Sequence, residues 1–302
     1  MQQSVAKSIR EELVPMHRAG SLVLPESYNY IGVFLTFRCP FRCSYCINRF
    51  NGSNLRFSEL SGREWIEWFD RLNTRDVPIT LQGGEPGSHR DFIEIVAKTI
   101  QNHPVDILTN LEFDLARFVT VVNPVKMNRP SPYAPIRVSY HPEQFSLVDI
   151  LGKVRFLRDE GFRVGLYGVM HPENLAAMEH AAAVCADLGI DFRTKPFLGW
   201  HNNVLHGEYA YPGVGSPGGK THWCECAPTE LLAAPDGSIH RCHSFLYAGR
   251  KPLGHVTDRM LKLSDEYLAC NRFGNCNPCD MKIKNNRFQQ FGHVAARIRN
   301  IR

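Results

Sequence analysis

Short apolar runs recur along the first two thirds of the chain, and longer segments of mixed polarity separate them. Each run is nearly continuous in apolar residues, which is typical of strands covered on both faces of a sheet. Six runs are therefore predicted to be strands, at residues 30–37, 77–82, 105–110, 135–141, 162–170 and 190–197.

The segments between these runs carry apolar residues at helical spacing. Ser61 and Glu64 form a capping-box pattern before one of the predicted helices, and two others are predicted to end at Gly161 and Gly189. Strands that alternate with helices predict parallel βα units joined by right-handed crossovers. The pattern therefore indicates an α/β fold, wound into an open or partly closed barrel.

Changes in composition divide the chain into four predicted regions. Residues 1–27 form an N-terminal extension, and residues 28–200 form the barrel. Residues 201–223 are rich in Gly and Pro, so we expect a linker or a lid over a substrate. Residues 224–302 form a small cysteine-rich region whose core looks too poor to be stable without metal.

Composition narrows the classes of function. With 43% hydrophobic and 22% charged residues, the chain has the composition of a soluble globular protein. It contains no apolar run long enough to span a membrane and no signal peptide, so we expect a cytoplasmic protein. The net charge of +5 is too mild to call for a nucleic acid partner. No phosphate-binding loop, G-x-S-x-G or H-E-x-x-H motif supports a hydrolase.

Ten cysteines are many for a protein of a reducing compartment, where disulfides are rare. Metal or redox chemistry is therefore the expected use of most of them. Nine fall into two groups, at 39–46 and 224–279, whereas Cys185 stands alone in an Ala-rich helical stretch and is predicted to be a core residue.

The first group, Cys39, Cys43 and Cys46, directly follows the first predicted strand. A structural zinc site requires four ligands, and no fourth Cys or His lies within ten residues of this group. Three thiolates on a four-iron cluster leave one iron open, as a catalytic centre requires.

With Tyr45 as the aromatic residue, this C-x3-C-x-aromatic-C run resembles the signature of radical S-adenosylmethionine (SAM) enzymes. The resemblance implies a partial (β/α)6 TIM-like barrel with a 4Fe-4S cluster on the three thiolates. It further implies that SAM binds the open iron and is cleaved reductively to a 5′-deoxyadenosyl radical, which abstracts hydrogen from a substrate.

Further motifs at strand ends resemble the cofactor contacts of that family. Gly83-Gly84-Glu85-Pro86 resembles the GGEP motif, whose backbone and Glu meet the methionyl amino group. Asn110 follows Thr109 in a Thr-Asn-Gly pattern whose glycine is replaced by Leu111. Ser139 matches a ribose contact, or is simply a hydrogen-bonded strand hydroxyl. The resemblance thus assigns cofactor contacts to Tyr45, Gly83, Gly84, Glu85, Pro86, Asn110 and Ser139.

The second group consists of Cys224, Cys226, Cys242, Cys270, Cys276 and Cys279. A Gly-x4-Cys hairpin followed by a distal pair resembles the twitch and SPASM regions, which implies an auxiliary 4Fe-4S cluster. The favoured ligands are Cys226 or Cys224 together with Cys242, Cys276 and Cys279. The alternative is a zinc site built from the Cys224–Cys226 and Cys276–Cys279 pairs.

Other polar residues also fall after predicted strands. His141 with Glu143 and His171 with Glu173 belong to two HPE tripeptides, for which helix capping is favoured over a role in the substrate cavity. Lys195 is placed to pair with a carboxylate of the cofactor or of the substrate.

The sequence therefore predicts a radical SAM enzyme that receives electrons from an external reductant such as flavodoxin or ferredoxin. Two substrate classes stay open: a ribosomally made peptide and a small metabolite that is oxidised or rearranged. The alternative is a non-catalytic iron–sulfur or zinc-binding sensor or binding protein.

Overall fold

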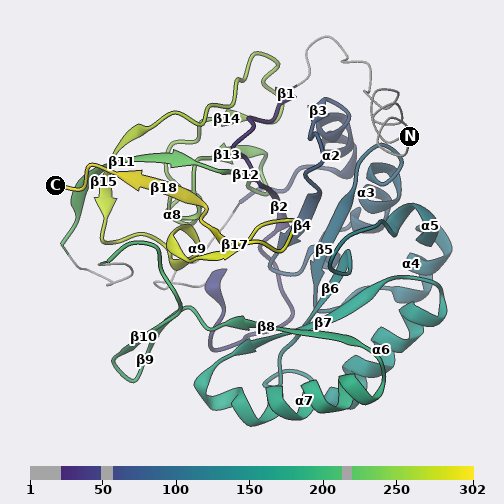
Figure 1. Ribbon diagram of the computed structural model, residues 1–302. Helices are drawn as coiled ribbons and strands as arrows, with labels where there is room; N and C mark the ends of the chain where they lie inside the picture. The colour runs from purple at the N-terminus through teal and green to yellow at the C-terminus, as the bar shows by residue number, and fades with distance from the viewer. Residues whose placement is uncertain (1–21, 49–56, 213–219) are drawn as a thin grey trace, which may run out of the picture.

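The computed structural model describes residues 22–48, 57–212 and 220–302, and its centre is a nine-stranded sheet of order β14-β13-β12-β2-β4-β5-β6-β7-β8 (Figure 1). The six predicted strands are confirmed, and neighbours among them pair in parallel. Their bounds are β2 (Tyr30–Thr36), β4 (Ile79–Gly83), β5 (Val105–Thr109), β6 (Ile136–Tyr140), β7 (Val164–Met170) and β8 (Asp191–Pro196). The predicted α/β partial barrel is therefore correct.

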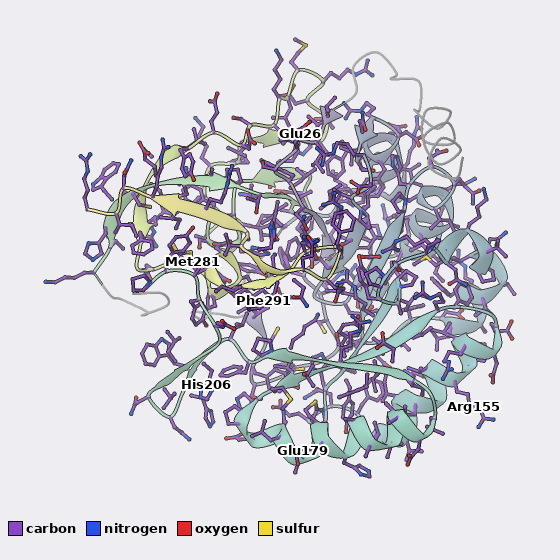
Figure 2. The ribbon with its side chains drawn as sticks, viewed as in Figure 1. Glu26, Arg155, Glu179, His206, Met281 and Phe291 are labelled. Atoms are coloured by element: carbon purple, nitrogen blue, oxygen red, sulfur yellow. The ribbon has the colours of Figure 1, made fainter. Side chains whose placement is uncertain are left out.

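Helices cover the outer face of these strands (Figure 1). They are α2 (Gly62–Phe69), α3 (Phe92–Thr99), α4 (Leu115–Val121), α5 (Pro124–Met127), α6 (Leu147–Asp159) and α7 (Leu175–Asp187). The predicted capping box at Ser61 is present. Buried aromatic and aliphatic side chains fill the layer between helices and sheet, and Cys185 is fully buried there as predicted. On the opposite side of the helix layer, Arg155 of α6 and Glu179 of α7 point outward (Figure 2).

Part of the C-terminal region continues the barrel sheet. Strand β12 (Glu230–Ala233) pairs in parallel with β2, with Leu232 opposite Gly32. Strands β13 (Ser238–His240) and β14 (Gly254–His255) then add antiparallel neighbours at this edge. The pairing of β12 with β2 could not be predicted from the sequence, because the two strands lie about 200 residues apart along the chain.

A second, smaller sheet lies beside the barrel and has the order β15-β11-β18 (Figure 1). Its antiparallel strands are β11 (His222–Pro228), β15 (Leu268–Phe273) and β18 (Ala296–Arg299). The short helix α8 (His243–Tyr247) follows β13, and α9 (Pro278–Met281) follows β15; Asp280 of α9 accepts hydrogen bonds from the backbone of α8. Met281 and Phe291 mark this part of the molecule in Figure 2.

A C-terminal hairpin bridges the first and last strands of the barrel. It is formed by β16 (Lys284–Asn285) and β17 (Phe291–His293). Arg287 makes an ion pair with Asp76, just before β4, at 2.8 Å, and Gln289 accepts a hydrogen bond of 2.9 Å from Arg193 of β8. The hairpin therefore lies across the side that the parallel strands leave open.

The remaining elements are peripheral. Strands β1 (Leu22–Val23) and β3 (Leu72–Asn73) form a short parallel pair, and β9 (Gly199–His201) with β10 (Val204–His206) forms a hairpin that projects from the body (Figure 1). Residues 1–21 of the predicted extension and 213–219 of the predicted lid lie outside the described residues. Among the helices that the structure describes, none has the length and apolar character that a membrane crossing requires.

Candidate functional site

One large cavity, of about 690 Å³, runs through the barrel interior and reaches the carboxyl ends of its strands. The first cysteine group and the GGEP residues line one part of it, and side chains of β6, β7 and β8 line another. The remaining wall comes from the C-terminal region, including Cys279, Lys282 and His293. This volume lies within the range of pockets that enclose a ligand of ordinary size.

The loop after β2 brings Cys39, Cys43 and Cys46 to this cavity. Cys43 is buried, and Cys39 and Cys46 are half-buried, so the three thiols lie in the wall of the cavity and not on the outer surface.

The cysteine loop is held from the side by the segment after β6. Glu143 accepts hydrogen bonds from the backbone N–H of Ser44 at 2.8 Å and from its hydroxyl at 2.6 Å. The Tyr45 hydroxyl lies 3.0 Å from Nδ1 of His141. Capping was therefore the wrong expectation for this HPE tripeptide, because Ser146 caps α6 and Glu143 binds the cysteine loop.

The second HPE tripeptide does cap a helix. His171 accepts a hydrogen bond from the backbone of Glu173 and begins the short 3-10 helix η3 (Pro172–Asn174), as predicted. Its ring also stacks on Tyr45, with ring centroids 5.2 Å apart. The Tyr45 ring is thus fixed between two histidines from neighbouring strand ends.

The paired glycines let the end of β4 pack against the loop that carries Cys39. The backbone N–H of Gly84 donates to the Thr36 carbonyl at 2.8 Å, and that of Glu85 donates to the Arg38 carbonyl at 2.8 Å. A Cβ atom at Gly83 would lie 2.1 Å from the Thr36 oxygen, and one at Gly84 would lie 2.2 Å from the Arg38 oxygen. Any other residue type would push these two loops apart.

Glu85 is buried and joins its own turn to the end of β5 at the cavity wall. Its carboxylate accepts from the Gly87 N–H at 2.9 Å, the Thr109 hydroxyl at 2.7 Å and the Asn110 N–H at 2.6 Å. Burial raises the pKa of Glu85 to about 7 although these three hydrogen bonds favour the charged form. Asn110 in turn places its amide 3.7 Å from the Cys39 sulfur.

Leu111 keeps the backbone conformation that a glycine would adopt at this position. Its φ angle is +62°, in the left-handed region, and its side chain is fully buried. Its N–H donates to the Thr109 hydroxyl at 2.8 Å. The sequence departs from Thr-Asn-Gly here, but the turn after β5 is one that glycine adopts without strain.

The other predicted cofactor contacts also border the cavity or its edge. Pro86 begins the short helix η2 (Pro86–Ser88), and Ser139 lines the cavity with a hydroxyl that makes no hydrogen bond to another described side chain. A link from this turn to the C-terminal region was not predicted from the sequence. The Tyr247 hydroxyl donates to Asn48 at 2.7 Å, and the Asn48 amide donates to the Gly83 carbonyl at 2.5 Å.

The surroundings of the first cysteine group favour the neutral form of its buried thiol when no metal is bound. Burial, followed by the neighbouring Cys46, raises the pKa of the Cys43 thiol to about 12. A metal centre removes this penalty, because a thiol that coordinates a cation is deprotonated outright. Three buried or half-buried thiols on one loop that faces a large cavity fit a 4Fe-4S cluster with an open iron.

The family model of the radical SAM superfamily matches residues 33–185, about half of the chain. The chain belongs to the radical SAM superfamily. Members of this superfamily are enzymes that use SAM and a 4Fe-4S cluster for radical chemistry. The matched residues include the strands and loops described above.

Solved structures of radical SAM proteins share this fold. SuiB from Streptococcus suis, bound to S-adenosylmethionine, aligns with a TM-score of 0.55 and 13% identity over 86% of this chain and 68% of its own. The protein anSMEcpe with bound AdoMet aligns with a TM-score of 0.51 and 12% identity over 78% of each chain. Its complex with AdoMet and the Kp18Cys peptide gives a TM-score of 0.51 and 13% identity, over 76% of this chain and 78% of its own.

The second cysteine group of this radical SAM protein is assembled by strand pairing. Cys224 lies directly opposite Cys270 in the β11–β15 pair, and Cys226 lies two residues on, on the same face of β11. The sulfur atoms of these three residues are all within 4.8 Å of one another. Cys270 was not in the favoured ligand set, because nothing local in the sequence indicates that β15 pairs with β11.

A void of about 20 Å³ adjoins this trio and is lined by Cys226, Cys242, Cys270 and Cys276. Cys279 instead lines the large cavity. The structure therefore places Cys226, Cys242 and Cys276 of the favoured set around one void, adds Cys270 to them, and places Cys279 in a wall that faces the barrel.

Proposed function

We propose that this radical SAM enzyme binds its 4Fe-4S cluster through Cys39, Cys43 and Cys46 and acts on a substrate held between the barrel and the C-terminal region. When bound, the reduced cluster and SAM supply a 5′-deoxyadenosyl radical that abstracts a hydrogen atom from substrate. The observation that carries the proposal is the three-thiol loop, which faces a large cavity and is braced by the GGEP turn.

The chain's own residues orient the two cofactors in this proposal. The loop between β4 and η2 presents backbone groups of Gly83 and Gly84 to the methionyl end of SAM, and Glu85 holds that loop against the end of β5. Tyr45 and Ser139 line the same cavity, where they would contact the adenosyl part. The enclosed cavity excludes bulk water from the reacting carbon.

A peptide is the proposed substrate class. It is supported by anSMEcpe, a structure of the same fold that was solved with a bound peptide. A small metabolite is the second candidate, because the C-terminal hairpin lies across the open side of the barrel and leaves limited room beside a cluster and SAM. A peptide would then insert one side chain and leave the rest of its backbone outside.

An auxiliary metal centre in the second cysteine group is part of the proposal. Cys226, Cys242 and Cys276 belong both to the sequence-derived set and to the residues around the small void. The fourth ligand is Cys279 by sequence spacing or Cys270 by position in the void. The close spacing of Cys224, Cys226 and Cys270 also fits a single tetrahedral ion such as zinc, so metal content decides between a cluster and an ion.

The test is anaerobic reconstitution, metal analysis and assay of SAM cleavage. Two four-iron clusters predict about eight irons per chain, and the addition of SAM and a strong reductant is expected to form 5′-deoxyadenosine. Four irons with one zinc would assign the second centre to zinc. Cys43→Ala is expected to abolish 5′-deoxyadenosine formation, whereas Cys185→Ala, in the core, retains it. Undiminished cleavage in Cys43→Ala would disprove the catalytic role of this loop.

A further inference from the structure

The positive charges around the large cavity are of two kinds. Four cations of its wall are ion-paired with carboxylates: Arg137 with Asp106, Arg193 with Asp191, Arg287 with Asp76, and Lys284 with Glu230. Lys195 and Lys282 also line the cavity, but neither makes an ion pair with a carboxylate of the residues that the structure describes. These two amines are the cations left to meet a ligand.

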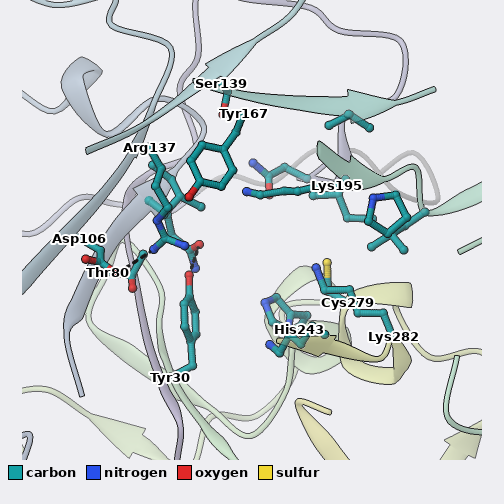
Figure 3. Close-up of a pocket in the computed structure, with 18 of the residues that line it drawn as sticks. Tyr30, Thr80, Asp106, Arg137, Ser139, Tyr167, Lys195, His243, Cys279 and Lys282 are labelled. Atoms are coloured by element: carbon teal, nitrogen blue, oxygen red, sulfur yellow. Dashed lines mark hydrogen bonds and ion pairs between the residues drawn. The ribbon is translucent and has the colours of Figure 1, made fainter. Parts of the chain in front are cut away.

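The two lysines come from facing walls. Lys195 projects from the end of β8, and Lys282 follows α9 in the C-terminal region; Figure 3 shows Lys195 opposite Lys282 and Cys279. The Lys195 ammonium lies 5.4 Å above the centre of the Tyr167 ring, an interaction that leaves its N–H groups free to donate. The two ammonium groups therefore face the same space inside the cavity.

The surroundings of Lys195 disfavour its charge when no ligand is bound. Burial, followed by the positive charges of Arg137 and Lys282, lowers the pKa of Lys195 to about 7. Glu208 also lines the cavity near Lys282, but its side chain is exposed and pairs with neither lysine. An anion placed between the lysines would offset their mutual repulsion, so the charge pattern of this wall is complementary to a negative group.

We propose that Lys195 and Lys282 bind an anionic group of the substrate, a carboxylate or a phosphate, and so fix which carbon faces the bound cofactors. This inference rests on the proposed function and names the chemistry of its substrate. The lysines lie on the side of β8 and the C-terminal region, whereas the GGEP turn lies at the end of β4, and β5, β6 and β7 separate these strands in the sheet. We assign the anion to the substrate and not to the carboxylate of SAM.

Chemical protection of Lys195 tests this directly, with no need for turnover. The reconstituted chain is treated with a neutral amine-acetylating reagent near pH 7, and the acetylation rate of each lysine is read by mass spectrometry. The probes are N-acetylalanine, N-acetylaspartate methylamide and inorganic phosphate, with uncharged N-acetylalanine methylamide as the control. Exposed Lys98 of α3 serves as the internal reference.

We expect at least one anionic probe to slow acetylation of Lys195 by about fivefold or more, because an anion that raises its pKa by about one unit removes most of the free amine. Lys98 and the uncharged control should show no such effect, and Lys282→Met should remove the protection while Lys98→Met preserves it. The probe that protects best identifies the anionic group of the substrate: N-acetylalanine indicates a chain terminus, N-acetylaspartate methylamide a side-chain carboxylate, and inorganic phosphate a phosphate.

Three results would overturn the assignment: no protection by any anion, equal protection by the uncharged amide, or protection of Lys195 by SAM alone. The last would assign the lysines to the cofactor. Because the rates are measured without SAM cleavage, the assay can fail while 5′-deoxyadenosine still forms. Failure of this inference is thereby distinguishable from failure of the proposed function.

Discussion

The two cysteine groups of this protein differ in how they are assembled and in what surrounds them. The first lies within eight residues of one loop, with its thiols facing a cavity of about 690 Å³. The second is drawn from strands and helices up to about 50 residues apart, with three thiols within 4.8 Å of one another beside a void of about 20 Å³.

This difference follows the general distinction between catalytic and structural metal sites. A catalytic centre keeps an open coordination position toward a substrate, whereas a structural centre is enclosed by protein ligands. By that criterion, our proposal assigns the chemistry to the first group and a structural role in the C-terminal region to the second. The second group nevertheless borders the cavity through Cys279, so its influence can reach the substrate wall.

The largest effect that separates the two groups is expected from Cys276→Ser, because Cys276 belongs to both candidate ligand sets of the second centre. The variant should lose the metal of that centre and keep about four irons at the first. Metal binding contributes folding free energy to such regions, so limited proteolysis should cut residues 224–302 faster than in the parent protein. Full metal content in this variant would remove the second centre from the proposal.

Metal content measured on a matched pair of variants identifies the fourth ligand of the second centre. Cys270→Ser and Cys279→Ser each remove one thiol, and only the variant that removes a ligand should lose metal from the second centre. The void geometry favours Cys270, and the sequence spacing favours Cys279.

What the sequence reveals depends on the distance along the chain between interacting residues. The six barrel strands were predictable, because each is a continuous apolar run of its own. The first cysteine group could also be predicted from the sequence, since its three members lie on one loop. The capping box at Ser61 is local as well, and it is present.

The interactions that the sequence did not reveal are those between distant segments. Glu143 holds Ser44 from 99 residues away, although the motif it belongs to suggested capping. Cys270 meets Cys224 because β15 pairs with β11, and β12 joins β2 across the chain. Such pairings depend on the assembled sheet, so no spacing rule within one segment indicates them.

The contact between Glu143 and Ser44, which holds the loop of the first cysteine group, is expected to have an intermediate effect on cluster stability. Glu143→Gln keeps the shape of the side chain but removes the charge that strengthens its two bonds to Ser44. A charge-assisted hydrogen bond exceeds a neutral one by about 1 kcal/mol, which predicts loss of the first cluster to a chelator about fivefold faster.

The matched control for Glu143→Gln is Glu173→Gln, in the other HPE tripeptide. The Glu173 carboxylate lies 3.9 Å from His201 and makes no hydrogen bond or ion pair with the described part of the cysteine loop. Iron release followed by absorbance should therefore be unchanged in this variant. Equal rates for the two substitutions would show that the contact with Ser44 does not stabilise the loop.

The smallest expected effect concerns Leu111, where the barrel departs from the family pattern but keeps its turn. Both Leu111→Ala and Leu111→Gly lose a buried side chain, at a cost of about 2–5 kcal/mol in unfolding free energy. At a φ of +62° alanine stays strained and glycine does not, so the glycine variant should be the more stable by about 1 kcal/mol. Urea unfolding of the apo chain measures the difference. The same pair at Leu35, buried in β2, should show the opposite order, because glycine weakens the interior of a strand. A glycine variant at 111 that is less stable than the alanine variant would mean that the surrounding packing, and not the left-handed turn, determines the conformation after β5.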